Sequence, residues 1–205
     1  DGDGDRVIMV DHTGQVCDGD HLLYLIAQDL HRQGALKGGV VGTHMTNGAL
    51  ESAFKQLKVP FERVAVGDRH VMAQLKQNGW QLGGEPSGHL IDLNQTLSGD
   101  GIIAALQVLN AMINQDSSLH ALTATLPKLP QALMNLTRPT DFSLETQPSL
   151  PQIKTDALEQ LGKSGRILIR NSGTEPLVRV FVEGQDPIKV EHTAKTVSEK
   201  IEALF

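Results

Sequence analysis

Three short polar segments carry the residues whose types and spacing could do chemistry. They are residues 1–6, 84–89 and 170–176. In the first segment Asp1, Asp3 and Asp5 alternate with glycine, so three carboxylates follow one another with no other side chain between them. Glycine permits tight backbone curvature, and carboxylate oxygens are the ligands that hard cations such as Mg²⁺ prefer. The spacing therefore predicts that the three carboxylates converge on one divalent cation.

Two other interpretations of residues 1–6 have to be weighed. A calcium-binding EF-hand loop needs Gly at its sixth position and Glu at its twelfth, where this chain has Arg6 and His12. We therefore reject an EF-hand, whereas a solvated acidic turn stays open on spacing alone. Arg6 favours a functional site, because a cation beside a carboxylate–metal cluster can hold a phosphate against the metal.

The segment 84–89 places a carboxylate, a hydroxyl and an imidazole close together, from Glu85, Ser87 and His89. Glu and Ser can hydrogen-bond neighbouring sugar hydroxyls, while His can contact a phosphate or transfer a proton. A polar turn bounded by glycine, with an incidental histidine, is the commoner outcome for so short a motif. The segment therefore predicts a sugar site only in combination with the others.

The third segment predicts an anion pocket. Arg170 and Arg179 flank a loop in which Gly173 separates the hydroxyls of Ser172 and Thr174. Backbone amides, hydroxyls and guanidinium groups are the donors that bind phosphate. The loop is not of the Walker A type, because no Gly-Lys-Ser/Thr follows it. A β-hairpin turn with incidental arginines is the alternative, and Arg179, in an otherwise apolar predicted strand, speaks against it.

Strands and helices are predicted to alternate over the first 125 residues. Strands are expected over 7–10, 39–43, 61–66, 81–83 and 89–93, and helices over 18–34, 50–57, 69–75 and 100–114. This alternation predicts a parallel or mixed sheet, and ligands bind such sheets beyond the carboxyl ends of the strands. We therefore expect the loops at Thr43, Asp68-Arg69 and Glu85–His89 to share one edge. Asp68 and Arg69 can equally belong to a helix N-terminus on the surface, and Gly99-Asp100 is interpreted as a turn and helix cap.

The composition changes between residues 126 and 151, which include five prolines. We interpret 126–150 as a linker or crossover, with room for one strand over 131–137. Residues 151–205 then predict helix, strand, strand and helix, the pattern of a small two-layer α+β domain. The expected fold class is α/β: residues 1–15 end one domain, 16–125 form a mixed-sheet α/β/α domain, and 151–205 form the α+β domain.

Composition also excludes several classes of function. A net charge of −6 argues against a nucleic-acid partner, which needs a concentrated basic face. The single cysteine, Cys17, allows no intrachain disulfide, fits a reducing compartment and is expected to be buried. No apolar run is long enough to span a membrane, and no signal peptide opens the chain. We therefore expect a cytoplasmic protein without a membrane partner.

In this order and at these separations, the three segments resemble the α-D-phosphohexomutase family over the whole chain. The resemblance implies the end of the second, all of the third and all of the fourth of four domains around a central cleft. Within the family, Val66–Arg69 and Gly88–Ile91 look like the phosphoglucosamine mutase branch. Pro86 departs from that branch, where a polar residue is more usual. A phosphomannomutase or phosphoglucomutase is therefore the alternative.

The resemblance also implies a role for each candidate residue. Asp1, Asp3 and Asp5 would hold Mg²⁺. Arg6 and His89 would be catalytic, with Arg6 beside the phosphoryl group. The sugar would be bound by Asp68, Arg69, Glu85, Ser87 and His89, and its distal phosphate by Arg170, Ser172, Gly173, Thr174 and Arg179.

The implied reaction is an intramolecular phosphotransfer of the isomerase class, in amino-sugar metabolism and peptidoglycan precursor synthesis. It interconverts glucosamine 6-phosphate and glucosamine 1-phosphate. A phosphoserine of the enzyme takes part, and either glucosamine 1,6-bisphosphate or glucose 1,6-bisphosphate serves as primer.

The family's phosphoserine lies in a Ser-His-Asn-Pro-like loop of the first domain, and no serine in this chain is followed by histidine. We therefore expect a C-terminal fragment that is inactive alone and has the missing N-terminal domains as its partner. A homodimer is left open. The rival interpretations are a non-catalytic phosphosugar-binding module and a structural domain with acidic turns.

Overall fold

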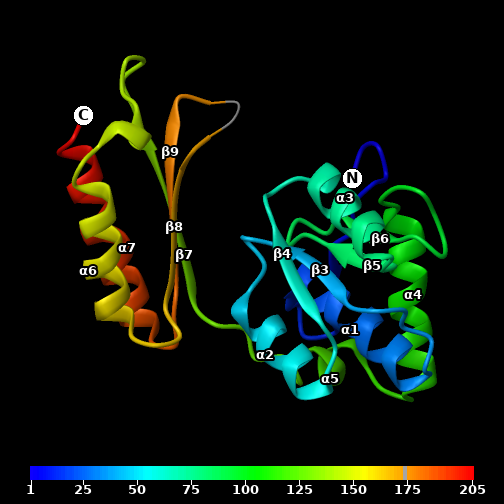
Figure 1. The fold of residues 1–205 in the computed structure, drawn as a ribbon. Coiled ribbons are helices and arrows are strands. Elements are labelled where there is room, and N and C mark those ends of the chain that lie inside the picture. The colour runs from blue at the N-terminus through cyan, green and yellow to red at the C-terminus, as the bar shows by residue number, and fades with distance from the viewer. Residues whose placement is uncertain (173–174) are drawn as a thin grey trace. The chain divides into compact units, whose positions relative to one another are not determined.

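A computed structural model of the chain describes residues 1–172 and 175–205 (Figure 1). These residues form two compact units, Asp1–Lys128 and Leu129–Phe205. Within the described ranges, no helix is both long and apolar enough to cross a membrane.

The first unit is built around a four-stranded sheet. Its elements are β1 (Met9–Val10), β2 (Val16–Cys17), α1 (Gly19–Arg32), β3 (Val40–Thr43), α2 (Gly48–Leu57), β4 (Phe61–Val64), α3 (Asp68–Asn78), β5 (Leu82–Gly84), β6 (Leu90–Asp92), α4 (Gly101–Asn114) and α5 (Leu119–Thr123). The sheet has the order β4-β3-β5-β6, with β3 parallel to β4 and β5, and β6 antiparallel to β5. The predicted mixed sheet is therefore confirmed.

Both faces of this sheet are covered by helices. Successive residues of a strand point to opposite faces, so Val40 and Val41 of β3 belong to different cores. Val40 packs into the larger core with apolar side chains of α1, α2, α4 and α5. Val41 packs with Val71 and Leu75 of α3 on the opposite face. This arrangement confirms the predicted α/β/α layers, and Cys17 is buried as expected.

The helices begin where polar caps or glycine allow them to begin. Asp100 accepts hydrogen bonds from the backbone N–H groups of Ile102 and Ile103, both at 2.9 Å, and so caps α4 as predicted. Gly67 precedes α3 with a φ of +126°, a conformation that residues with a side chain rarely adopt. Gly67 therefore sets the direction in which the chain leaves β4 and enters α3.

The second unit has two layers. Its elements are β7 (Gln131–Thr137), a 3₁₀ turn η1 (Leu144–Thr146), α6 (Leu150–Leu161), β8 (Arg166–Asn171), β9 (Leu177–Glu183) and α7 (Pro187–Glu202). The sheet is antiparallel with the order β7-β9-β8, and α6 and α7 cover one of its faces (Figure 1). The α+β layers and the strand over 131–137 are confirmed, while the domain boundaries at residues 15, 125 and 150 stay predictions.

Candidate functional site

Two of the three predicted segments come together in the first unit: the Asp/Gly loop (residues 1–6) and the Glu85–His89 loop. Val7 donates its backbone N–H to the carbonyl oxygen of Gly88 at 3.1 Å, and Arg6 forms an antiparallel β-bridge with His89. The His89 Nδ1 lies 3.1 Å from Asp5 Oδ2, a contact between residues 84 positions apart. The carboxylates of one loop and the imidazole of the other therefore form one site.

The three aspartates of the Asp/Gly loop converge as predicted. Asp1, Asp3 and Asp5 each offer a carboxylate oxygen, and these oxygens lie within 4.8 Å of one another. Asp5 Oδ1 is buried and accepts no hydrogen bond from the described residues, although Arg6 Nε lies 3.4 Å away. Three close carboxylates repel one another, and oxygen donors are the ligands of Mg²⁺. The donor set therefore fits a magnesium ion.

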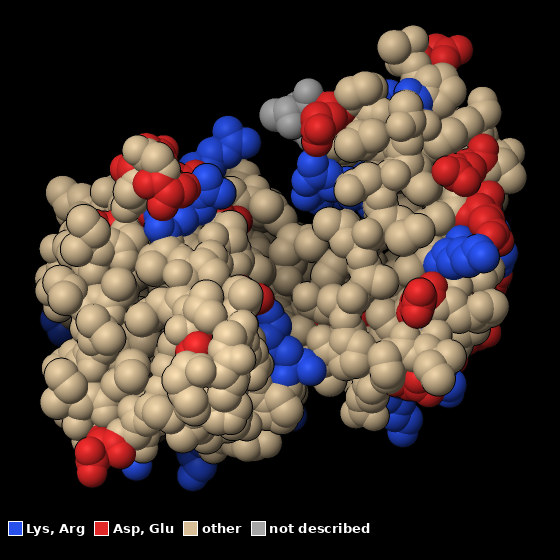
Figure 2. Space-filling model, turned by 180° about the vertical axis from the view of Figure 1, so that it is seen from behind, with Lys and Arg blue, Asp and Glu red and all other residues tan. Residues whose placement is uncertain are grey.

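Arg6 lies against these carboxylates. Its Nε donates to Asp1 Oδ2 at 2.6 Å, and its side chain is 49% exposed. Figure 2 shows acidic and basic side chains together at the upper end of the unit formed by residues 1–128, which is on the left in that view. Carboxylates can bind a metal cation, and a guanidinium group beside them can bind an anionic group such as a phosphate that contacts the same cation.

The Glu85–His89 loop also meets the loop that follows β4. Glu85 Oε1 accepts a hydrogen bond from the backbone N–H of Gly67 at 2.9 Å, so the carboxyl ends of β4 and β5 share one edge as predicted. Ser87, Asp68 and Arg69 are exposed beside this junction. Arg69 Nε lies 3.3 Å from Nε2 of His70, the next residue of α3, so the Arg69 side chain contacts its own helix.

In the second unit, Arg170 of β8 stands directly opposite Arg179 of β9 in the strand register. Burial, together with the charge of Arg179, lowers the pKa of Arg170. Arg179 Nη2 donates to Glu175 Oε2 at 2.8 Å, but Arg179 Nε is buried without a hydrogen-bond partner in the described part of the chain. Two guanidinium groups with one carboxylate leave net positive charge and an unused donor, which is what an anion pocket requires.

The loop between β8 and β9 is described only in part. Ser172 is buried, and its backbone N–H donates to the carbonyl oxygen of Leu177 at 2.8 Å. Gly173 and Thr174, the other predicted phosphate ligands, lie outside the described residues. The predicted pocket is therefore represented here by Arg170, Ser172 and Arg179.

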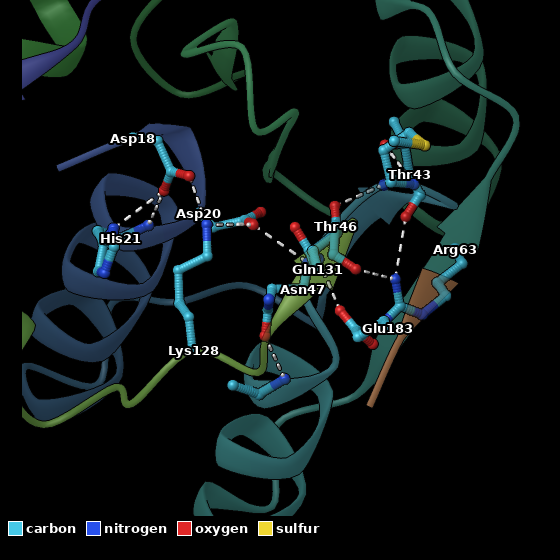
Figure 3. A network of polar contacts seen from close by, with 12 residues as sticks. Asp18, Asp20, His21, Thr43, Thr46, Asn47, Arg63, Lys128, Gln131 and Glu183 are labelled. Atoms are coloured by element: carbon cyan, nitrogen blue, oxygen red, sulfur yellow. Dashed lines mark hydrogen bonds and ion pairs between the residues drawn. The ribbon is translucent and has the colours of Figure 1, made fainter. Parts of the chain in front are cut away.

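A partly buried ion-pair network around Lys128 was missed by sequence reasoning (Figure 3). Lys128 Nζ contacts Asp18 Oδ2 and lies 3.1 Å from Asp20 Oδ2, on the first turn of α1. Asp20 is 1% exposed, and burial raises its pKa. Burial also disfavours ionised Asp18, but hydrogen bonds from His21 and Lys128 outweigh this effect and bring its pKa to about 2. No short motif links positions that are more than 100 residues apart.

The chain matches two described domain families. Residues 18–129 match "Phosphoglucomutase/phosphomannomutase, alpha/beta/alpha domain III", and residues 120–200 match the "C-terminal domain" of the same family. A protein of Photorhabdus laumondii named phosphoglucosamine mutase is 49% identical over 201 residues, which are 98% of this chain and 45% of that protein. A Legionella pneumophila (strain Lens) protein of the same name is 48% identical over 204 residues, covering 100% and 45%.

Among solved structures, the chain is similar to Aspergillus fumigatus N-acetylphosphoglucosamine mutase in complex with GlcNAc-6P and magnesium. The TM-score is 0.84 at 23% sequence identity, covering 98% of this chain and 51% of the other. At a sequence identity of 23%, this similarity shows a shared fold only. The chain spans about half the length of the curated relatives it matches. The family description of domain III matches more than half of the residues of this chain, and the chain therefore belongs to the phosphoglucomutase/phosphomannomutase family.

Proposed function

We propose that this chain supplies the metal-binding, sugar-binding and phosphate-binding half of a phosphoglucosamine mutase. The enzyme interconverts glucosamine 6-phosphate and glucosamine 1-phosphate, in the synthesis of amino-sugar precursors of peptidoglycan. The single observation that carries the proposal is the contact between His89 and Asp5, because it unites the metal loop with the sugar loop. The names of the relatives support the choice of amino sugar.

Asp1, Asp3 and Asp5 would hold Mg²⁺, which neutralises charge on a transferring phosphoryl group when it is bound. Arg6 then lies where its guanidinium can hold the phosphoryl oxygens. In this proposal His89, whose Nδ1 contacts Asp5, exchanges a proton with the sugar hydroxyl. Glu85 and Ser87 bind the hydroxyls of the sugar, and Asp68 and Arg69 lie at the same edge of the sheet.

Arg170, Ser172, Gly173, Thr174 and Arg179 would hold the phosphate that does not react. Holding the substrate by this group positions either end of the sugar for reaction, so that much of the rate enhancement comes from orientation. A sugar bisphosphate, glucosamine 1,6-bisphosphate or glucose 1,6-bisphosphate, would serve as primer. We place the enzyme in the cytoplasm, and its association into a homodimer stays a prediction.

The proposal is tested by a graft. The matching part of the Photorhabdus laumondii relative is replaced by this chain, and conversion of glucosamine 6-phosphate is followed with a bisphosphate primer. We expect turnover by the graft, none by the 205-residue chain alone, and strong loss in the graft with Arg170→Gln. A folded graft without turnover would overturn the proposal, and turnover by the chain alone would overturn its dependence on the missing domains.

A non-catalytic phosphosugar-binding module is the second candidate, because the Arg170–Arg179 pair needs no metal. Mg²⁺ affinity at the Asp/Gly loop distinguishes the two functions. A module of this kind would bind phosphosugar equally well with and without Mg²⁺.

A further inference from the structure

We infer that Gly99 is a positioning residue for His89. Gly99 lies in the turn between β6 and α4, a segment that the sequence predicted only as a turn and helix cap. A Cβ atom added to Gly99 would overlap His89 Nε2 and would lie 2.6 Å from Cε1 and 2.7 Å from Cδ2 of the same ring. The backbone of Gly99 therefore forms one wall of the space that the imidazole occupies.

The backbone conformation of residue 99 does not by itself require glycine. Gly99 is not among the glycines with a positive φ, unlike Gly67 or Gly88. Any residue could adopt its φ, so the absence of a side chain serves the close approach of His89. The glycine at position 99 is therefore explained by the adjacent His89 ring and not by the backbone conformation of the turn.

His89 has little freedom to move away from a side chain at position 99. The residue is 8% exposed, and its Nδ1 lies 3.1 Å from Asp5 on the other edge of the ring. Its backbone is fixed by the bridge to Arg6 and by the hydrogen bond between Val7 and Gly88. A methyl group at position 99 therefore forces a shift, and we expect the imidazole to turn and to lose its contact with Asp5.

The start of α4, directly after this turn, also contacts the Asp/Gly loop. Gly101 donates its backbone N–H to the carbonyl oxygen of Gly4 at 2.8 Å, and a Cβ on Gly101 would lie 2.5 Å from the carbonyl oxygen of Arg6. Gly99 in the turn therefore packs against the imidazole, and Gly101, the first residue of α4, packs against the Asp/Gly loop. These two glycines set how closely His89 and the carboxylates approach each other.

The test is a double-mutant cycle on this chain with Gly99→Ala, His89→Ala and the double variant, followed by thermal unfolding and by NMR of the histidine ring nitrogens. We expect Gly99→Ala to lower the Tm and to shift the His89 ring signals. In the His89→Ala background the same substitution should change the Tm little, because the obstructing ring is gone. Ser98→Ala, at the exposed neighbouring position, is the control and should leave both readouts unchanged.

Unshifted His89 signals in Gly99→Ala, or an equal loss of Tm in both backgrounds, would overturn the inference. The expected effect of Gly99 on catalysis rests on the proposed function and is measured separately in the grafted enzyme. There Gly99→Ala should lower kcat by at least about tenfold, since proton transfer depends on geometry, with KM changed less. If the unsubstituted graft has no turnover but the cycle shows coupling, the proposed function fails and the positioning of His89 by Gly99 stands.

Discussion

Arg170 and Arg179 occupy directly opposite positions in the antiparallel register of β8 and β9. Like charges placed opposite each other destabilise a sheet by roughly 0.2–1 kcal/mol. Glu175 neutralises only one of the two guanidinium groups. The pair is therefore better explained by a ligand than by the stability of the unit.

Arg170→Gln is accordingly expected to leave the C-terminal unit as stable as before, or more stable by up to about 1 kcal/mol. Hydrogen exchange of the β9 amides measures the stability of this unit. Trp fluorescence does not report on it, because the single Trp of the chain lies in the other unit. Lys163→Gln, at an exposed position of the same unit, is the matched control and should have no effect. A loss of stability in Arg170→Gln alone would show that the pair is structural.

Asp3→Asn tests the metal site. Removal of one of three carboxylates should weaken Mg²⁺ binding by at least about tenfold, because both a ligand and a charge are lost. Isothermal titration of Mg²⁺ into the chain measures the dissociation constant. Asp141→Asn replaces an exposed aspartate of the other unit and should leave it unchanged. Equal affinities for Asp3→Asn and the unsubstituted chain would rule out Asp3 as a ligand.

Lys128→Met tests the network of Figure 3. The substitution leaves Asp20 buried without its cation, which should destabilise the first unit by about 3–5 kcal/mol. Trp80 fluorescence during urea unfolding reports on this unit. Lys200→Met breaks an exposed pair with Asp156 in the other unit and is the control, which should leave the unfolding of the first unit unchanged. Adding Asp20→Asn to Lys128→Met should restore part of the loss, and no restoration would contradict the burial argument.

Asp18 predicts a specific response to acid. Its pKa of about 2 in the folded chain lies below the value of about 3.9 expected after unfolding. A lowered carboxyl pKa stabilises the fold above pH 4, and this stabilisation is lost as the pH falls from about 4 to 2. Asp18→Asn should therefore make the stability of the first unit less steep over this interval. An unchanged pH profile in Asp18→Asn would contradict the assignment.

The sequence predicted the elements and the edge of the sheet well, because hydrophobic periodicity and turn residues are local signals. The junction of Gly67 with Glu85 followed from the rule that parallel strands end at one edge. The strand predicted over 7–10 is shorter in the structure, Met9–Val10, and the short helix α5 was missed. A five-residue helix shows too few turns to give a periodic pattern.

What the sequence did not predict depends on contacts between distant positions. The hydrogen bond between Asp5 and His89 joins residues 84 positions apart, and Lys128 contacts Asp18 across 110 positions. The role of Gly99 depends on which ring lies beside it, so its letter suggested only a turn. Spacing identified the candidate groups, whereas tertiary packing decides which of them meet.

In the proposed function, the Arg170–Arg179 pair holds the phosphate of a phosphosugar. Calorimetric titration of the 205-residue chain with glucosamine 6-phosphate, in the presence of Mg²⁺, tests it most directly. We expect saturable binding that exceeds binding of unphosphorylated glucosamine and competes with inorganic phosphate. This binding should be lost in Arg170→Gln but kept in Lys163→Gln. Equal heats for the phosphorylated and unphosphorylated sugar, or undiminished binding by Arg170→Gln, would contradict it.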